Sequence, residues 1–121
     1  MAKILIIEDE EPLTRVLKDH LEEEKYEVLI AKNGEDGLDL AKTEHPDLII
    51  LDIVMPKMNG QEVLKNLRKD SWGKKANVIF ATNVGTVEAI NESMASGVTD
   101  YFIKSETSLE DIVKIAKSKL K

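Results

Sequence analysis

Five short runs of apolar residues recur along the chain, and a stretch with helical periodicity follows each of them. Runs of this length are typical of β-strands buried on both faces, and they cover residues 4–7, 28–31, 48–51, 78–81 and 101–103. The run at 48–51 leads directly into Asp52, and a turn built on Pro56 and Gly60 comes next. A carboxylate in that position is costly to desolvate, so we expect it to have a cation or metal as its partner.

The segments between the strands are predicted to be amphipathic helices, because apolar residues return every three or four positions. Several residues mark helix boundaries: Pro12 suits a first turn, Asn33-Gly34 opens the second helix, Ser108 suits an N-cap, and Gly97 suits a C-terminal stop. The residues expected to face the core are Leu13, Val16, Leu17 and Leu21 in the first helix, Leu38 and Ala41 in the second, Val63, Leu64 and Leu67 in the third, Ala89, Ile90 and Met94 in the fourth, and Leu109, Ile112, Val113, Ala116 and Leu120 in the fifth.

Strict alternation of strands and helices predicts an α/β fold. Its sheet is parallel, its crossovers are right-handed, and helices cover both faces in the doubly wound manner. The 121 residues are enough for one domain with a real core, and no linker or internal repeat interrupts them. We therefore expect residues 1–121 to form one domain with no separate output domain.

Composition removes several classes of function. The absence of cysteine excludes disulfides and thiolate chemistry, and the two histidines, His20 and His45, are too far apart in the sequence to suggest a zinc site. A net charge of -6 with only 4% aromatic residues argues against direct nucleic-acid binding. Four apolar residues followed by acids at the start form neither a signal peptide nor a membrane span, so a cytoplasmic location is expected.

Chemically active side chains follow four of the predicted strands. Glu8 and Asp9 follow the first, Asp52 the third, Thr82 the fourth and Lys104 the fifth. In an open parallel sheet these strand ends meet at one edge, which is where ligands bind. Each of them also has an ordinary explanation when viewed singly. Glu8 and Asp9 could be a solvated acidic turn and Asp52 a helix cap, while Thr82 could be an ordinary strand-end hydroxyl and Lys104 an exposed base. Their convergence on one edge favours a shared site.

Oxygen ligands of this kind suit Mg²⁺, which keeps several waters and needs few carboxylates. An ammonium and a hydroxyl beside the cation match the charge of a phosphoryl group. A carboxylate in the same site could act as a nucleophile and form an aspartyl phosphate. The residues alone therefore favour phosphoryl chemistry at Asp52.

Several functions remain open at this point: a phosphorylation switch, a small aspartyl-nucleophile phosphatase or phosphotransferase, a scaffold without phosphorylation, and an FMN-binding module. Aspartyl-nucleophile phosphatases and phosphotransferases often carry a second acid two residues after the nucleophile, where this chain has Val54. A flavin site would need phosphate-cradling loops rich in Ser, Thr and Gly, which the acidic turn at residues 8–11 does not provide. The intact set of polar residues speaks against a scaffold.

The sequence resembles the receiver domains of two-component response regulators, particularly the single-domain chemotaxis and sporulation regulators. The resemblance extends over residues 3–120 and rests on residues 4–10 (ILIIEDE), 31–34 (AKNG), 46–60 (PDLIILDIVMPKMNG) and 97–104 (GVTDYFIK). It implies a flavodoxin-like fold with strand order 2-1-3-4-5 and five helices. It also allows the chain to be a fragment cut from a longer regulator.

The resemblance implies a role for each site residue. Asp52 is the phosphoacceptor, and its donor is a histidine kinase or a histidine phosphotransfer protein. Mg²⁺ is held by Glu8, Asp9, Asp52 and the main-chain carbonyl of Val54, and Lys104 pairs with the phosphoryl oxygens. Thr82 moves to bond the phosphoryl group and Tyr101 is the aromatic switch.

The same resemblance implies how the signal leaves the domain. A downstream protein would dock on the face formed by the fourth helix, fifth strand and fifth helix, and the chain would be a monomer or a weak dimer through that face. Contact with nucleic acid or membrane is not expected.

Three positions depart from the family pattern. Ser105 follows Lys104 where proline is usual, Asn83 follows Thr82 where a small residue is usual, and Asn77 replaces a common proline. A cis bond before a non-proline residue costs about 3–4 kcal/mol, so we expect the loop at Ser105 to differ in shape from that of its relatives.

Overall fold

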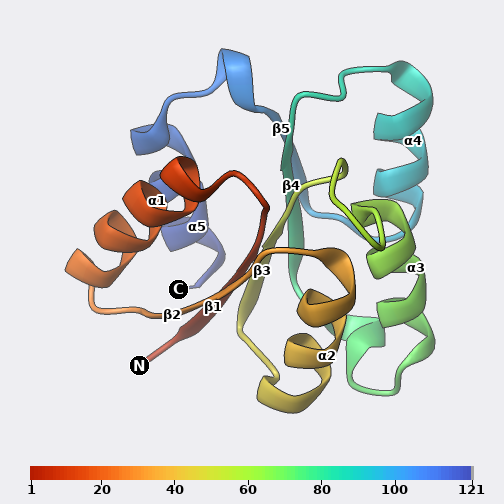
Figure 1. The fold of residues 1–121 in the computed structure, drawn as a ribbon, viewed down its shortest axis with the longest axis horizontal. Helices are drawn as coiled ribbons and strands as arrows, with labels where there is room; N and C mark the ends of the chain where they lie inside the picture. The colour runs from red at the N-terminus through yellow and green to blue at the C-terminus, as the bar shows by residue number, and fades with distance from the viewer. Residues whose placement is uncertain (121) are drawn as a thin grey trace.

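A single sheet of parallel strands lies between two layers of helices in the computed structural model, which describes residues 1–120 (Figure 1). The strands follow the order β2-β1-β3-β4-β5, and their bounds are β1 (Lys3–Ile7), β2 (Glu27–Ala31), β3 (Leu48–Leu51), β4 (Val78–Thr82) and β5 (Asp100–Ile103). This order and the five predicted strands confirm the doubly wound, flavodoxin-like α/β fold.

The helices divide between the two faces of the sheet. One face is covered by α1 (Glu11–Glu23) and α5 (Leu109–Lys119), and the other by α2 (Gly34–Glu44), α3 (Gly60–Lys69) and α4 (Val87–Ala95). Residues 1–120 also contain two short 3-10 turns, η1 (Gly73–Lys75) and η2 (Lys104–Glu106). None of the helices within residues 1–120 is long and apolar enough to cross a membrane.

Helix boundaries follow the predicted capping residues. The side chains of Asn33 and Ser108 accept hydrogen bonds from backbone N–H groups in the first turns of α2 and α5. Pro12 lies in the first turn of α1. Just beyond the C-terminal end of α4, Gly97 has a φ of 84°, a left-handed conformation that favours glycine.

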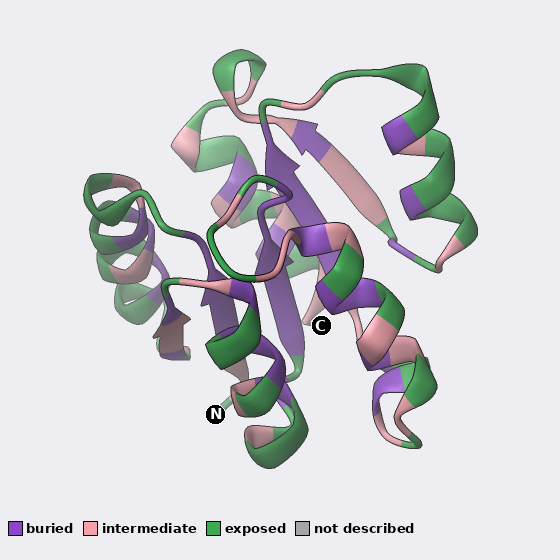
Figure 2. Ribbon diagram, turned by 45° about the vertical axis from the view of Figure 1, so that its right-hand side comes forward, coloured by how far each residue is buried: buried purple, intermediate pink, exposed green. Residues whose placement is uncertain are grey.

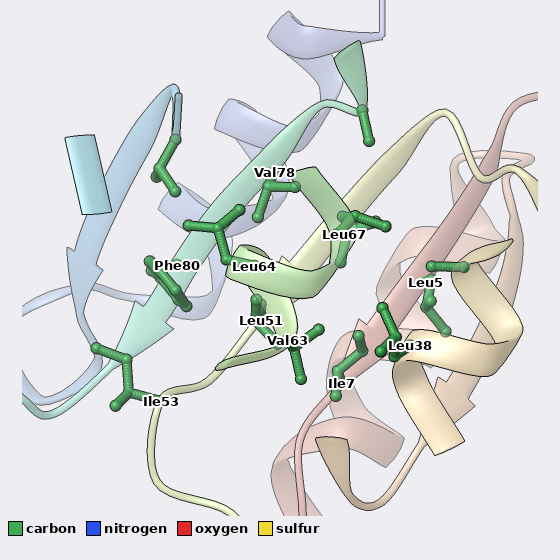
Figure 3. Close-up of a cluster of buried hydrophobic side chains, with 14 of the residues drawn as sticks. Leu5, Ile7, Leu38, Leu51, Ile53, Val63, Leu64, Leu67, Val78 and Phe80 are labelled. Atoms are coloured by element: carbon green, nitrogen blue, oxygen red, sulfur yellow. The ribbon is translucent and has the colours of Figure 1, made fainter. Parts of the chain in front are cut away.

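The three inner strands, β1, β3 and β4, are buried on both faces because their side chains alternate between two apolar clusters, whereas the edge strands β2 and β5 are partly exposed (Figure 2). In β1, Leu5 and Ile7 join the cluster under α2 and α3, while Ile4 and Ile6 join the cluster under α1 and α5. Figure 3 shows Leu5 and Ile7 beside Leu38 of α2, with Val63, Leu64 and Leu67 of α3 also in this cluster. The core therefore fixes the sheet and leaves the strand ends free to carry polar groups.

Two predicted core residues were assigned wrongly. Val16 is 44% exposed and Met94 is 48% exposed. Their places are taken by the buried hydroxyl residues Thr14 and Ser93, whose side chains donate to the carbonyls of Glu11 and Ala89. A hydroxyl that bonds a carbonyl within its own helix can be buried at little cost, and the apolar pattern alone could not indicate this.

Candidate functional site

The carboxyl edge of the sheet brings together all of the polar residues that the sequence placed there. Ile7 of β1 pairs with Leu51 of β3, so Glu8 and Asp52 follow side by side. Thr82 closes β4 opposite Ile103 of β5, and Lys104 comes next. Parallel register thus converts positions far apart in the chain into one site.

Three carboxylates form the acidic part of the site. Glu8, Asp9 and Asp52 each offer an oxygen, and these oxygens all lie within 4.8 Å of one another. Glu8 and Asp52 are buried at 4% and 5% exposure, whereas Asp9 is exposed. An oxygen-only donor set, half open to water, fits Mg²⁺.

Lys104 supplies the positive charge of the site. Its ammonium lies 2.7 Å from Oε1 of Glu8, 3.1 Å from Oδ2 of Asp52 and 3.2 Å from Oε1 of Glu10. The Lys104 side chain is only 9% exposed, so the two buried carboxylates satisfy a cation that would otherwise be costly to desolvate. Sequence analysis did not foresee the contact with Glu10, because that contact depends on how the loop after β1 folds.

Burial and charge shift the ionisation of this group. Desolvation raises the pKa of Glu8 to about 7, and the nearby Asp52 charge adds to this shift while the Lys104 hydrogen bond opposes it. For Lys104, desolvation lowers the pKa, but the bonds to Glu8 and Asp52 outweigh it and the pKa is raised. The ammonium therefore remains charged, whereas the proton on Glu8 is exchangeable near neutral pH.

Asp52 is held by its own loop on the other side. The Ile53 N–H donates to Oδ1 of Asp52 at 2.7 Å, and the Asp52 N–H donates to the Ile7 carbonyl at 3.0 Å. Gly60 packs directly on the Asp52 carbonyl, where a Cβ would lie 2.1 Å from the oxygen. A side chain at position 60 would therefore displace the acid that the site is built around.

Thr82 and Tyr101 are joined through one loop residue. Thr82 is fully buried, and its hydroxyl accepts the Val84 N–H at 3.3 Å. The Tyr101 hydroxyl donates to the Val84 carbonyl, and the ring meets Phe80 edge to face with centroids 5.7 Å apart. Burial, and secondarily the charge of Asp52, raises the Tyr101 pKa. The structure thus connects both predicted switch residues to the loop after β4.

Val54 lies two residues beyond Asp52 and its side chain is 66% exposed. The use of its main-chain carbonyl as a metal ligand stays a prediction. The two histidines lie outside the site, His20 on α1 and His45 at the end of α2, where its ring stacks on Trp72.

The sequence that carries these acids, the lysine and the threonine also matches a known protein family. Residues 4–117 match the response regulator receiver domain. The chain belongs to this family. A phosphorylation-dependent switch is general to receiver domains, and they typically bind Mg²⁺ at an acidic pocket such as the one formed here by Glu8, Asp9 and Asp52.

Individual relatives agree with this assignment. The probable transcriptional regulator ycf27 of Cyanophora paradoxa is 37% identical over 102 residues, which are 84% of this chain and 41% of that protein. The transcriptional regulatory protein PcoR of Escherichia coli is 35% identical over 115 residues, or 95% of this chain and 50% of that protein. The receiver domain thus spans half or less of these curated relatives.

Solved structures show the same fold. The CheY-like response regulator receiver domain protein of Methanospirillum hungatei JF-1 superimposes with a TM-score of 0.91 at 30% identity, covering 99% of this chain and 94% of that one. The agreement over nearly the whole length of both chains supports the sheet order and the placement of the strand ends.

Proposed function

We propose that this receiver domain accepts a phosphoryl group on Asp52 from a histidine kinase or a histidine phosphotransfer protein in the cytoplasm. The observation that carries the proposal is the position of Asp52, a buried carboxylate that contacts the Lys104 ammonium and lies beside the acid pair Glu8 and Asp9. An Asp52 oxygen attacks the phosphorus, the bond from phosphorus to the donor imidazole nitrogen breaks, and its electron pair stays on the imidazole.

The surrounding groups neutralise the charge of the transferred group. Glu8, Asp9 and Asp52, with the Val54 carbonyl, would hold Mg²⁺, which supplies positive charge to the phosphoryl oxygens. Lys104 is already 3.1 Å from Asp52 and would contact the same oxygens from the β5 side. The domain thus supports its own phosphorylation and dephosphorylation but does not turn over an external substrate.

A phosphoryl group on Asp52 carries up to about two negative charges and replaces the single charge of the carboxylate. The Thr82 hydroxyl, which accepts the Val84 N–H in this structure, would turn to donate to a phosphoryl oxygen. That exchange changes the bonds of Val84, whose carbonyl also holds the Tyr101 hydroxyl. Thr82 and Tyr101 would in this way pass a charge change at β3 to the loop before α4.

The surface that would read this change is the face made by α4, β5 and α5. Val87 is 69% exposed and Met94 48% exposed, and with the half-buried Ile90 they form an apolar stripe along α4 at helical spacing. An exposed apolar stripe beside the switch loop suits a downstream protein partner or a weak dimer. We propose that this receiver domain signals through this face.

The direct test is intact mass after incubation with acetyl phosphate and Mg²⁺. The wild-type protein should gain one phosphoryl group, and Asp52→Ala should gain none. Asp39→Ala removes an exposed acid on α2 and is the matched control, which should be phosphorylated like wild type. Phosphorylation of Asp52→Ala to the wild-type extent would overturn the assignment of the acceptor.

The output face has its own test. Addition of beryllofluoride, a phosphoryl mimic, should shift the NMR signals of residues 83–104 more than those of α2. A perturbation centred on α2 would contradict this face.

A further inference from the structure

Two of the positions at which this chain departs from its family are bonded to each other. The Ser105 N–H donates to Oδ1 of Asn83 at 3.0 Å. Asn83 directly follows Thr82, and Ser105 directly follows Lys104. One hydrogen bond therefore joins the backbone beyond the switch hydroxyl to the backbone beyond the ammonium.

The bond needs the particular residues that this chain carries. Proline at position 105 would have no N–H to donate, and alanine at position 83 would have no side-chain acceptor. Ser105 lies in η2, which begins at Lys104. Ile103, the residue before this 3-10 turn, provides no side-chain cap. The Ser105 N–H has no partner within the η2 turn, and the Asn83 side chain, from the loop after β4, accepts it as a cap.

A second contact ties the same two segments. The Tyr101 hydroxyl of β5 donates to the carbonyl of Val84, the residue after Asn83. The loop after β4 is thus bonded twice, through the Val84 carbonyl to Tyr101 within β5 and through the Asn83 side chain to Ser105 beyond β5. The strands themselves are paired up to Thr82 and Ile103, and the Asn83–Ser105 bond continues the contact between the two segments into their loops.

We propose that the Asn83–Ser105 bond is a clamp that positions Thr82 and Lys104 to act on one phosphoryl group at Asp52. Asn83 is a positioning residue: its side chain bonds the Ser105 N–H and no carboxylate within residues 1–120, and it acts through the backbone next to Thr82 and Lys104. The inference rests on the proposed phosphorylation of Asp52. Without the clamp the two loops must be ordered when the phosphoryl group arrives, and binding bears that cost.

The clamp predicts a separation between two ligands. Asn83→Ala should weaken beryllofluoride binding, measured with Mg²⁺ at saturation, by about twofold to tenfold, the range of one net hydrogen bond. Mg²⁺ affinity measured alone should change less than beryllofluoride affinity, because its carboxylate ligands Glu8, Asp9 and Asp52 follow β1 and β3, outside the two clamped loops. General loss of structure would not separate the two affinities in this way.

A double-mutant cycle isolates the bond itself. Ser105→Pro removes the N–H but also restrains Lys104 before it, so it is measured both in wild type and in Asn83→Ala. The clamp predicts that Ser105→Pro weakens beryllofluoride binding more in wild type than in Asn83→Ala. Ser105→Ala keeps the N–H and removes only the hydroxyl, so it should behave as wild type.

Amide hydrogen exchange supplies an independent reading. The Ser105 amide should exchange faster in Asn83→Ala than in wild type, while unfolding curves of the two proteins remain close, since both side chains lie at the surface. Equal beryllofluoride affinities in wild type and Asn83→Ala, or additive effects in the cycle, would overturn the clamp. If wild type with Mg²⁺ bound no beryllofluoride, the proposed function would fail first and the clamp with it.

Discussion

The Lys104 ammonium lies 2.7 Å from a carboxylate oxygen of Glu8, closer than it lies to Asp52 at 3.1 Å. Without a metal, the buried lysine thus acts as counter-ion to both buried acids. On phosphorylation Lys104 would contact the phosphoryl oxygens, and Mg²⁺ would then replace it as the counter-ion of Glu8. The acids, the lysine and the metal therefore form one linked charge system, and the protonation of Glu8 should govern metal affinity.

We predict that Mg²⁺ binding weakens as pH falls through about 7. Desolvation raises the folded-state pKa of Glu8 to about 7, so below that pH the carboxyl binds a proton that the metal must displace. Above it the carboxylate is free and the affinity levels off. Calorimetric titration should show affinity falling by up to about tenfold for each pH unit below the midpoint.

The matched variant is Glu8→Gln, which has no titrating carboxyl. It should bind Mg²⁺ more weakly than wild type above pH 7 and lose the wild-type dependence on pH between about 6 and 8. A wild-type affinity that stayed flat across this interval would show that Glu8 is not protonated there, or not a ligand.

Asp9→Ala should separate metal binding from stability. Asp9 is exposed and makes no ion pair or side-chain hydrogen bond within residues 1–120, so its removal should change the free energy of unfolding by less than about 0.5 kcal/mol. Mg²⁺ affinity should fall at least severalfold, because one of the three carboxylate ligands is lost. Calorimetry with Mg²⁺ and urea unfolding measure the two quantities, and an Asp9→Ala variant that binds as tightly as wild type would remove Asp9 from the metal site.

Gly60→Ala should damage the site through the backbone of Asp52. The added Cβ would lie 2.1 Å from the Asp52 carbonyl oxygen, so the loop must move and phosphorylation by acetyl phosphate should slow. The free energy of unfolding should drop by about 1–3 kcal/mol, as expected of overpacking. Gly85→Ala is the control, because its Cβ would approach only the flexible end of Ile103, at 3.3 Å. Equal phosphorylation rates for Gly60→Ala and wild type would contradict the argument.

The sequence alone located the strand ends and most core-facing positions, because these depend on strand and helix periodicity. The run before Asp52 and the polar residues at the ends of β1, β4 and β5 were correctly placed at one edge of the sheet, because parallel strands deliver their ends to the same edge; their roles in phosphorylation stay predictions. Met94 was predicted to face the core, but the structure buries Ser93 there instead. The pattern of apolar residues does not indicate that the Ser93 hydroxyl bonds the Ala89 carbonyl. The contact of Glu10 with Lys104 was also missed, because pairs across loops depend on rotamers and not on spacing.

Arg68 is another residue whose role appeared only in the structure. Its guanidinium on α3 donates to the carbonyls of Ser96, Gly97, Gly73 and Ala76. Desolvation lowers its pKa from the ordinary value, but a guanidinium remains charged. One side chain thus connects the end of α3 with the loops before β4 and β5.

We predict that Arg68→Met lowers the free energy of unfolding by about 2–3 kcal/mol, because several carbonyls lose a charged donor. Phosphorylation of Asp52 should continue in the folded variant, since Arg68 lies far from the carboxyl edge of the sheet. Arg68→Lys keeps the charge but not the fork of donors, and it should recover only part of the loss. Urea unfolding measures both, and full recovery by lysine would show that the charge, and not the hydrogen bonds, matters.

The last prediction concerns the lifetime of the phosphoryl group. Hydrolysis needs a water in line with the phosphorus, oriented by nearby polar groups. The side chains two residues beyond Asp52 and Thr82 are Val54, which is 66% exposed, and Val84, which packs partly against the core. Neither can hydrogen-bond a water. Asn83 lies nearby, but its Oδ1 already accepts the Ser105 N–H.

We therefore expect a long-lived phosphoryl group, and the double variant Val54→Asn, Val84→Glu should lose it faster than wild type. The Val84 main-chain bonds to Thr82 and Tyr101 do not involve its side chain, so the switch loop can keep its shape in this variant. Val54→Leu, Val84→Leu changes size without adding a polar group, and it should decay at the wild-type rate. Phosphate release after removal of the donor measures the decay, and a polar double variant no faster than the leucine control would refute the water-positioning argument.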